Sequence, residues 1–407
     1  MVFYGWRIVG IAAAAQGVSA GVTFYSYGIF VKPLAAEFDA PRLVVVFGLT
    51  LLMFTQGIVS PALGRALDAR SVRALMAGGI LVCAVGFVGL SLATRLWQIG
   101  FLFTTLVGVG AHMFGPLATA TLVANWFVRQ RGKALGVTAV GASLGGLIFP
   151  VAATRLVEAF GWRGTAEVFA VILVLFAVPV WLMVVNRPED MGTGLDGDLR
   201  GAPTAMPGDA NAGEIALLTS RNFWSITAAI GLAFCPVSVM LAHLVPYATD
   251  LGIEPQRAAF LMSAYAGASA AGRLLFGFMA DRLDNRVAMW IALLLLIAAW
   301  AGLVVAPSYP ALLAASAGLG VGVGGIMPLW GSLTGACFGR AVFGRAMGLM
   351  NPLMLPFNLA GAPIAAYVYD ETGSYTLVFT AFLGTLIASA SVIALIRIPT
   401  VEPAASV

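Results

Sequence analysis

Charged side chains are scarce in this sequence. Asp, Glu, Lys and Arg make up 10% of its 407 residues, whereas a soluble domain has roughly 25%. Hydrophobic residues make up 60%, and the mean hydropathy is +0.95. No acidic residue lies deep within any of the apolar runs. This composition excludes an ordinary soluble domain and is typical of a helical protein that crosses a membrane many times.

Histidine and cysteine, which often bind metals or carry nucleophilic chemistry, are also rare. The chain has two histidines and three cysteines, and their spacing fits no metal-ligand motif. We interpret Cys83, Cys235 and Cys337 as small core residues because they lie in or at the end of apolar runs. There is no glycine-rich phosphate loop and no nucleophile at workable spacing from a base. We therefore predict neither an enzyme nor an ATP-driven pump, and no cofactor.

Long apolar runs fill most of the chain. A helix needs about 20 mostly apolar residues to cross about 30 Å of hydrocarbon. The first run is too long for the core of a signal peptide and lacks a convincing cleavage site. The runs predict an all-α membrane protein with twelve transmembrane helices, at about 7–32, 43–66, 73–93, 98–126, 133–157, 165–185, 222–249, 257–280, 287–306, 310–337, 343–368 and 375–397.

The longest polar interruption divides these runs into two sets of six. Residues 186–221 are rich in Gly, Pro, Asp and Asn, a composition typical of a flexible linker. We predict an N-terminal six-helix bundle at 1–185, a cytoplasmic linker at 186–221, and a C-terminal six-helix bundle with a short tail at 222–407. An acidic linker could also bind a partner, although a plain tether is the simpler interpretation.

The positions of the Lys and Arg residues predict the orientation, because cytoplasmic loops carry the excess of both. If the N-terminus is cytoplasmic, a minority falls on the outer face: Lys32, Arg42, Arg95, Arg155, Arg163 and Arg257. All the others except Arg273 fall on the cytoplasmic face, so both termini are expected there. We expect an integral protein of a bacterial cytoplasmic (inner) membrane. The basic residues form no face suited to nucleic acid.

Arg273 is the only Lys or Arg well inside a predicted span. An arginine near the centre of a bilayer costs on the order of 3 kcal/mol, so it usually serves an anionic partner or a water-filled path. The alternative is a side chain that extends to the interface or bonds to a nearby carbonyl. By helix rise, Arg273 lies roughly 6 Å to the cytoplasmic side of the midpoint of its span, which is compatible with a central cavity.

Two loop motifs recur at nearly one offset. Residues 64–68 read Gly-Arg-Ala-Leu-Asp, and residues 277–282 read Gly-Phe-Met-Ala-Asp-Arg, 213 positions later. Residues 131–136 read Arg-Gly-Lys-Ala-Leu-Gly, and residues 343–348 read Phe-Gly-Arg-Ala-Met-Gly, 212 positions later. Two independent loops that recur in this way predict two similar halves with parallel topology.

The repeated loops contain candidate gating residues. Gly64 and Gly277 let neighbouring helices approach closely, and Asp68 and Asp281 can accept hydrogen bonds from helix N-termini or arginines. Such contacts can hold one access state and release it in another, whereas simple topogenic charge with local capping is the alternative. The basic candidates in the same loops are Arg73, Arg129, Arg131, Arg282 and Arg345.

The repeated loops resemble those of the major facilitator superfamily, and the likeness extends over essentially the whole chain. The second copy fits well at Gly277, Asp281 and Arg282. The first departs, with Ala69 where a basic residue is usual and Ser71 where glycine is usual. The resemblance implies two pseudo-symmetric six-helix bundles that rock about a central site.

A narrower resemblance involves the fifth span. Residues 126–136 read Trp-Phe-Val-Arg-Gln-Arg-Gly-Lys-Ala-Leu-Gly. Together with two later glycines they look like the fifth-helix signature of the monocarboxylate transporter family and its bacterial oxalate/formate-exchanger relatives. Residues 4–7 and 187–192 are weaker matches to the same group. The glycines also predict a seam of small residues for close helix packing: Gly132, Gly136, Gly141 and Gly145.

In that family an arginine of the eighth helix, four residues before a glycine, pairs with the substrate carboxylate, and Arg273 and Gly277 reproduce this spacing. A guanidinium suits the role because it forms two charge-assisted bonds to a carboxylate. Ser269 stands where proton-coupled members carry an aspartate, and Tyr25 stands near a lysine of several animal members. A single fixed positive charge favours a substrate with one carboxylate over a dianion such as oxalate.

Other polar residues at useful depth are candidates to line the site. Asn351 and Asn358 lie on the eleventh span, where oxalate exchangers have a lysine, and Tyr27 follows Tyr25 on the first span. His112 and His243 could each carry a proton, because imidazole titrates near neutral pH, although a lone histidine in a helix is more often a packing residue. The predicted substrate-binding set is Arg273, Ser269, Tyr25, Tyr27, His112, His243, Asn351 and Asn358.

The sequence therefore predicts a secondary carrier of small organic monocarboxylates that works by alternating access in a lipid bilayer. Proton symport and anion exchange both remain open, and a monomer would suffice. One alternative is a carrier of a non-carboxylate small molecule in which Arg273 is structural. A second alternative is a non-transporting receptor that reports external carboxylates.

Overall fold

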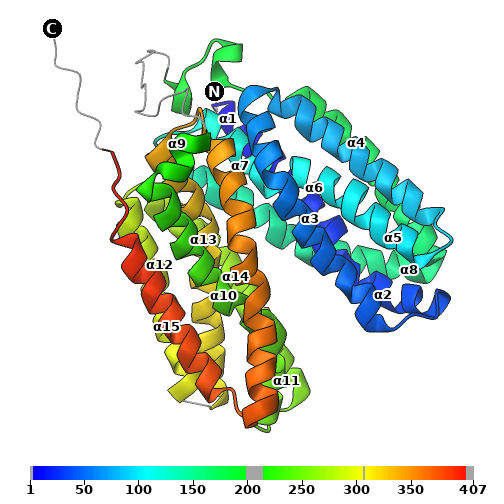
Figure 1. The fold of residues 1–407 in the computed structure, drawn as a ribbon. Coiled ribbons are helices and arrows are strands. Elements are labelled where there is room, and N and C mark those ends of the chain that lie inside the picture. Colours follow the sequence, from blue (N-terminus) through cyan, green and yellow to red (C-terminus); the bar gives the residue numbers. More distant parts are fainter. Residues whose placement is uncertain (1–2, 199–213, 306–307, 400–407) are drawn as a thin grey trace. The chain divides into compact units, whose positions relative to one another are not determined.

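Every regular element in the described part of the chain is a helix. The computed structural model describes residues 3–198, 214–305 and 308–399, and no strand occurs in these ranges (Figure 1). This result confirms the predicted all-α class. Residues 199–213 of the predicted linker and the tail from residue 400 onward lie outside the described residues.

Two long helical runs in the first half of the chain each contain a five-residue π-helical segment. In these segments Thr23 donates to the Ser19 carbonyl and Thr105 donates to the Phe101 carbonyl, and such bonds compete with the regular helical ladder. The elements in chain order are α1 (Gly5–Ala20), η1 (Gly21–Tyr25), α2 (Ser26–Glu37), α3 (Arg42–Ala69), α4 (Val72–Ser91), α5 (Leu96–Leu102), η2 (Phe103–Val107), α6 (Gly108–Phe114), α7 (Pro116–Trp126) and α8 (Arg131–Met183).

Two short 3-10 turns and a short helix come before the long helices of the second half. In chain order the elements are η3 (Pro188–Met191), η4 (Leu195–Gly197), α9 (Glu214–Thr219), α10 (Arg221–Asp250), α11 (Pro255–Ala280), α12 (Asn285–Val305), α13 (Tyr309–Phe338), α14 (Phe343–Thr372) and α15 (Thr376–Ile393).

The helices account for the twelve predicted spans. Among the described residues, nine helices are long and apolar enough to cross a membrane by length and composition. One of them, α8, has 53 residues, which at 1.5 Å per residue is enough to cross twice. The other two, α11 and α14, have 26 and 30 residues and reach the required length with a more polar composition.

A single glycine interrupts the helical geometry of α8 between its two predicted spans. Gly161 has φ of 68° and ψ of 177°, a conformation that only glycine adopts readily. This interruption is fixed from outside the helix, because Trp162 Nε1 donates a 2.5 Å hydrogen bond to Glu37 and Arg163 forms an ion pair with the same carboxylate. Arg163 also donates to the Ala93 carbonyl at 2.8 Å.

The chain divides into two compact units. Unit 1 contains Met1–Val128, Val137–Pro203 and Phe343–Pro352, and unit 2 contains Arg129–Gly136, Thr204–Val342 and Leu353–Val407. The start of α14 thus belongs to unit 1, and the start of α8 belongs to unit 2. The domain boundaries that the linker suggested stay a prediction.

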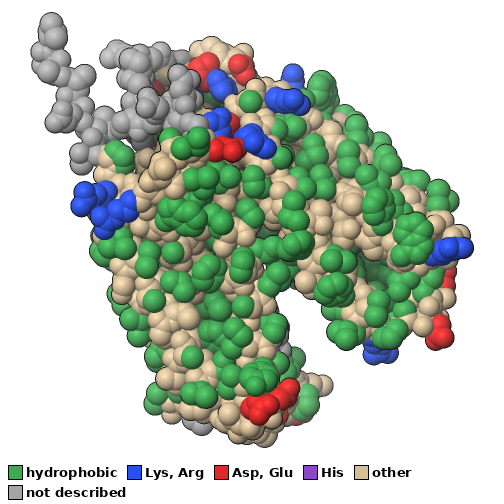
Figure 2. Space-filling model, viewed as in Figure 1, with side chains coloured by type: hydrophobic (Ala, Val, Ile, Leu, Met, Phe, Trp, Pro, Cys, Tyr) green, Lys and Arg blue, Asp and Glu red, His purple; other side chains and the backbone are tan. Residues whose placement is uncertain are grey.

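Side-chain type follows position along the helices. Figure 2 shows hydrophobic side chains over the flanks of the helices, whereas most charged side chains lie at helix ends. Large apolar side chains remain exposed on several helices, for example Ile58, Val85 and Leu175. Such surfaces are stable in contact with lipid and would aggregate in water.

Candidate functional site

Asp68, near the C-terminal end of α3, caps the N-terminus of α14 within unit 1. Its two carboxylate oxygens accept hydrogen bonds from the backbone N–H groups of Gly344 and Arg345, each 2.8 Å long. The Arg345 Nε lies 4.0 Å from Oδ2, and the Asp68 side chain is only 3% exposed. The first N–H groups of a helix lack partners and carry partial positive charge, so a buried carboxylate stabilises this end.

Asp281 makes the same arrangement in unit 2, at the N-terminus of α8. Its Oδ1 accepts from the Gly132 N–H at 2.6 Å, and its Oδ2 accepts from the Lys133 N–H at 2.9 Å. The hydrogen bonds to helix N-termini that the repeat suggested are therefore present for both aspartates. Their role in gating stays a prediction.

Glycines bring the helices into backbone contact at both caps. A Cβ atom added to Gly277 would lie 2.7 Å from the Gly132 carbonyl oxygen, and one added to Gly64 would overlap the Gly344 carbonyl. Both added Cβ atoms would come closer to backbone atoms than real Cβ atoms do, so alanine would not fit at either position. Glycine is therefore required where α3 meets α14 and where α11 meets α8.

The predicted seam of glycines on α8 contacts two different helices. Gly132 and Gly136 pack against α11 in unit 2, whereas Gly141 and Gly145 pack against α1 in unit 1. A Cβ atom on Gly17 of α1 would lie 2.7 Å from the Gly141 carbonyl oxygen. Small residues thus permit close packing along the first part of α8, as expected for helices in a membrane.

Arg273 lies on α11, one turn before Gly277, and is half-buried. Its backbone carbonyl contacts Gly136 of α8. Gly136 lies one helical turn after Gly132, whose N–H group donates to Asp281. One turn before Arg273, Ser269 is 8% exposed, and its carbonyl packs against Gly324 of α13.

The 213-residue offset gives Arg273 a counterpart in unit 1, and this residue is Ser60. A Cβ atom on Gly348 would lie 2.6 Å from the Ser60 carbonyl oxygen, just as Gly136 packs on the Arg273 carbonyl. The same offset relates Gln56 to Ser269. The two units therefore carry equivalent helix crossings, with a hydroxyl in unit 1 where unit 2 has a guanidinium.

Ser60 is the centre of a buried polar cluster in unit 1. Its Oγ lies 3.0 Å from His112 Nε2 and accepts a 3.1 Å hydrogen bond from Asn351 Nδ2. One turn along α3, Gln56 Nε2 donates to the Gly108 carbonyl oxygen at 3.2 Å. Two predicted site residues, His112 and Asn351, thus both bond to Ser60, a residue that the sequence-based prediction did not include. The signal that could have found it is its position 213 residues before Arg273.

The two tyrosines of the first span differ in exposure. Tyr27 is 9% exposed, its hydroxyl donates to the Val45 carbonyl, and its ring centroid lies 4.7 Å from that of Phe103. Tyr25 is 43% exposed, and its ring lies against Gly146 of α8. The Tyr25 side chain is therefore still accessible, whereas the Tyr27 hydroxyl is engaged in a hydrogen bond within unit 1.

His243 of α10 uses both ring nitrogens within unit 2. Nε2 lies 3.1 Å from the Ala362 carbonyl oxygen, and Nδ1 lies 3.1 Å from the Tyr375 hydroxyl. Since a carbonyl can only accept, Nε2 carries the proton and Nδ1 of the neutral ring accepts from the tyrosine. Asn358 is half-buried on α14 and makes no side-chain hydrogen bond to any described residue.

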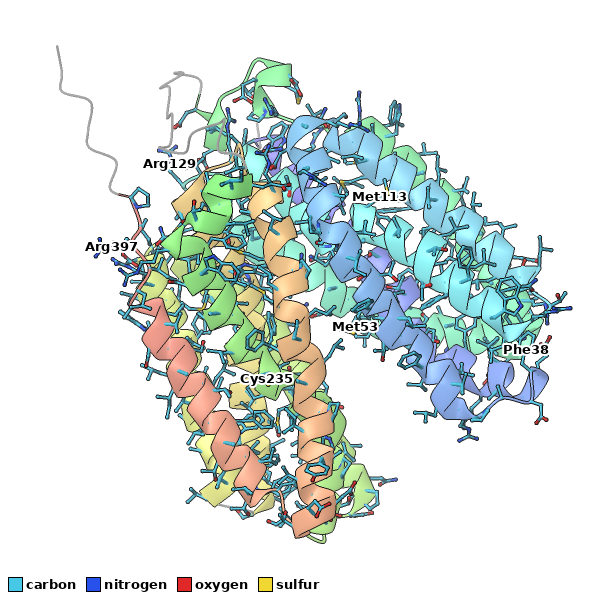
Figure 3. The ribbon with its side chains drawn as sticks, in the orientation of Figure 1. Phe38, Met53, Met113, Arg129, Cys235 and Arg397 are labelled. Carbon is cyan, nitrogen blue, oxygen red and sulfur yellow. The ribbon has the colours of Figure 1, made fainter. Side chains whose placement is uncertain are left out.

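The predicted basic gating residues have varied surroundings. Arg345 lies beside Asp68, and Arg131 is 3% exposed with its guanidinium against Gly335 of α13. Arg73 stacks over the Trp181 ring at 4.8 Å, and Arg282 stacks over the Phe278 ring at 3.9 Å. Arg129, labelled in Figure 3, lies in the turn before α8.

A separate cavity in unit 1 has an apolar lining. It encloses about 380 Å³ of empty space, open mouth included, between residues such as Val22, Tyr27, Phe103 and Trp162. No charged side chain lines it, so it does not suit a carboxylate. In the described part of the chain, no group of three or more His, Cys, Asp or Glu residues is placed to hold a metal ion.

Comparison with known proteins identifies the family. The model of the Major Facilitator Superfamily matches residues 13–254 and 238–407. This chain belongs to the Major Facilitator Superfamily. The transporter is 29% identical to monocarboxylate transporter 13 of Bos taurus over 96% of its own length and 88% of that protein. It is 30% identical to monocarboxylate transporter 11 of Homo sapiens over 96% of its own length and 82% of that protein.

A solved structure supports the fold. A double-tryptophan mutant of XylE matches 98% of the transporter and is itself covered to 97%, with a TM-score of 0.79 and 13% identity. At this identity the likeness concerns the fold alone. The twelve-helix arrangement and the membership inferred from the loop motifs are thus confirmed, and the protein is an integral membrane transporter.

Proposed function

We propose that this transporter carries small organic monocarboxylate anions by alternating access, with Arg273 as the anchor for the carboxylate. The observation that carries the proposal is the position of Arg273. It is the only Lys or Arg well inside an apolar span, and it stands at the crossing of α11 with α8. A guanidinium there can bind a carboxylate through two charge-assisted hydrogen bonds and fix its orientation.

Charge balance limits the substrate to one carboxylate. No Asp or Glu lies deep within an apolar run, so Arg273 is the one fixed charge that the sequence places at this depth. A monoanion neutralises this charge, whereas a dianion would enter with one charge unpaired, which is costly in a low dielectric. The similarity to proteins named monocarboxylate transporters supports the same substrate class.

The two aspartate caps supply a gate that can open and close. Each cap joins a carboxylate to the N-terminus of a helix through two backbone hydrogen bonds. Their loss would release the start of α14 or α8 and let the access state change. We place the caps on the cytoplasmic side of a bacterial inner membrane, with both termini cytoplasmic, because most Lys and Arg residues fall on that side.

The first test is thermal stabilisation of the purified full chain by acetate, lactate, pyruvate, benzoate, oxalate, a neutral sugar and an amine. A ligand that binds only the folded state raises the midpoint of unfolding. We expect monocarboxylates to stabilise the wild type and Arg273→Gln to bind them at least about tenfold more weakly, because a hydrogen bond to a charged group contributes about 1.5–3 kcal/mol.

Arg257→Gln is the matched control, since it removes an exposed arginine from the other end of the same helix, where Arg257 stacks over the Tyr309 ring. This variant should respond to carboxylates as the wild type does. Equal carboxylate stabilisation of the wild type and Arg273→Gln would overturn the proposal.

A further inference from the structure

The cluster of Ser60, His112 and Asn351 joins three helices that are far apart in sequence. His112 comes from α6, Ser60 from α3 and Asn351 from α14, and all three belong to unit 1. In Figure 3, Met113, the residue after His112, marks the end of α6, and Met53 marks α3. Ser60 is fully buried and His112 is 8% exposed. Polar side chains in such a setting depend on one another, because a buried polar group that loses its hydrogen-bond partner costs stability.

The cluster lies on a regular stripe of α3. Gln56, Ser60, Gly64 and Asp68 follow one another at intervals of four residues and therefore share one face of the helix. Gln56 bonds to α6, Ser60 bonds to α6 and α14, Gly64 contacts α14, and Asp68 caps α14. This face thus joins His112 to the capped end of α14.

The central hydroxyl can change its hydrogen-bond direction. While His112 Nε2 is unprotonated, the Ser60 O–H donates to it and the oxygen accepts from Asn351. Once Nε2 gains a proton, N–H donates to Ser60 Oγ, and the hydroxyl proton must turn to another acceptor. For a serine in a helix the usual acceptor is the carbonyl one turn back, here that of Gln56. Protonation of His112 is therefore transmitted to the oxygen that holds Asn351.

The charged and titratable groups near His112 are few. On α3, Arg65 and Asp68 follow Ser60 by five and eight residues toward the end of the helix. On α4, Cys83 lies behind α6 against Gly110, and Arg73 is near the start of the helix. Arg7 is at the start of α1, whereas α7 and η2 carry no ionisable side chain. On the segment of α14 that belongs to unit 1, Arg345 lies beside Asp68. His112 is thus the only side chain of the Ser60–His112–Asn351 cluster that can gain a proton.

We propose that His112 is the binding site of the coupling proton, and that Ser60 and Asn351 transmit its protonation state to α14. This inference rests on the proposed carboxylate function and makes the transporter a proton symporter. The charges balance, since the empty carrier returns with Arg273 cationic and His112 neutral. The loaded carrier holds Arg273, the bound carboxylate and protonated His112, so both forms carry the same net charge and the cargo is one proton with one anion.

Transport in proteoliposomes separates proton coupling from substrate binding. Radiolabelled lactate, pyruvate or benzoate is supplied in two assays, as accumulation driven by an acid exterior and as exchange at equal pH, with a pH-sensitive dye inside. We expect the wild type to accumulate substrate and acidify the interior together. His112→Gln, which keeps hydrogen bonding but cannot be protonated, should lose about tenfold in driven accumulation and less than about twofold in exchange.

A second variant keeps the test valid if His112→Gln does not fold. Ser60→Ala removes the acceptor for protonated His112, so the pH midpoint of driven accumulation should move down by roughly one unit. Ser389→Ala is the matched control, because it removes another buried serine hydroxyl, which donates to the Ala229 carbonyl in unit 2. It should leave the pH profile unchanged.

The outcomes distinguish the two proposals. A wild type that neither accumulates nor exchanges any of the three carboxylates overturns the proposed function. A wild type that exchanges them without internal acidification overturns the proton site alone. Driven accumulation by His112→Gln at the wild-type level, or an equal loss of driven accumulation and exchange, also overturns the proton site. An unshifted pH midpoint for Ser60→Ala overturns the transmission through the serine.

Discussion

Asp68 and Asp281 each replace the missing partners of another helix's first N–H groups. A carboxylate does this well because it accepts two bonds at once and its negative charge faces the positive end of the helix dipole. If the carboxylate is lost, those N–H groups need water or another acceptor, at a cost of about 1–3 kcal/mol for a buried group. The caps therefore stabilise one arrangement of the start of α14 and α8 without contributing to the carboxylate anchor.

At the residue scale, Asp281→Asn tests this account. An amide keeps one acceptor oxygen and loses the charge, so the cap is weakened. We expect the turnover of carboxylate transport to change by about tenfold, while the dissociation constant changes by less than about twofold. Counterflow rates and thermal-shift titrations measure the two quantities.

Asp284→Asn is the control for this variant, three residues away in the loop after α11. Hydrogen bonds from Arg286 lower the pKa of Asp284, so this half-exposed carboxylate is ionised throughout the neutral range. Its removal should leave turnover near the wild-type value, because exposed ion pairs contribute little. An Asp281→Asn transporter with unchanged turnover would remove the cap from the gating mechanism.

At the scale of elements, close helix crossings depend on glycine. The three atoms nearest to a Cβ added at Gly141 are backbone atoms of Ala13 on α1, and backbone cannot move aside as a flexible side chain can. The α1–α8 crossing therefore has no room for one methyl group. Gly10, also on α1, has no atom within 4 Å of a would-be Cβ.

Gly141→Ala should accordingly lower the free energy of unfolding by about 1–3 kcal/mol, the usual cost of overpacking. Gly10→Ala should be neutral or stabilise the protein by up to about 1 kcal/mol, because alanine favours the helix. Thermal unfolding of the two purified variants measures the difference. Equal midpoints would mean that the crossing is looser than the backbone contact indicates.

Sequence patterns predicted the elements better than the directions of their side chains. The twelve spans followed from run length, and the aspartate caps and the glycine seam followed from the repeat at residues 64–68 and 277–282. The repeat offset points to Ser60, but its contacts with His112 and Asn351 could not be predicted from it, because these residues lie 52 and 291 positions away on other helices. Helix rotation also decides that Arg73 of α4 stacks on the Trp181 ring, and run length carries no information about rotation.

At the scale of the whole molecule, the orientation in the membrane decides on which side the Asp68 and Asp281 caps lie. The three native cysteines are buried, so introduced cysteines report on their own positions. With a membrane-impermeant maleimide on intact cells, we expect Ser374→Cys, in the turn between α14 and α15, to be labelled from outside. Leu283→Cys, in the turn between α11 and α12, should be labelled only after the membrane is opened. The reverse pattern would place both caps on the outer side.

The first residues of α14 belong to unit 1 and those of α8 belong to unit 2. This assignment also determines the order in which the two caps can form during synthesis. Asp281 is made after Gly132, so its cap can form once α11 has left the ribosome. Asp68 is made 276 residues before its partner Gly344 and must wait for most of the remaining chain to be inserted. Unit 1 therefore begins first but cannot be completed until its last segment, Phe343–Pro352, has been made. A nascent chain that stops before α14 leaves the Asp68 carboxylate without its helix N-terminus.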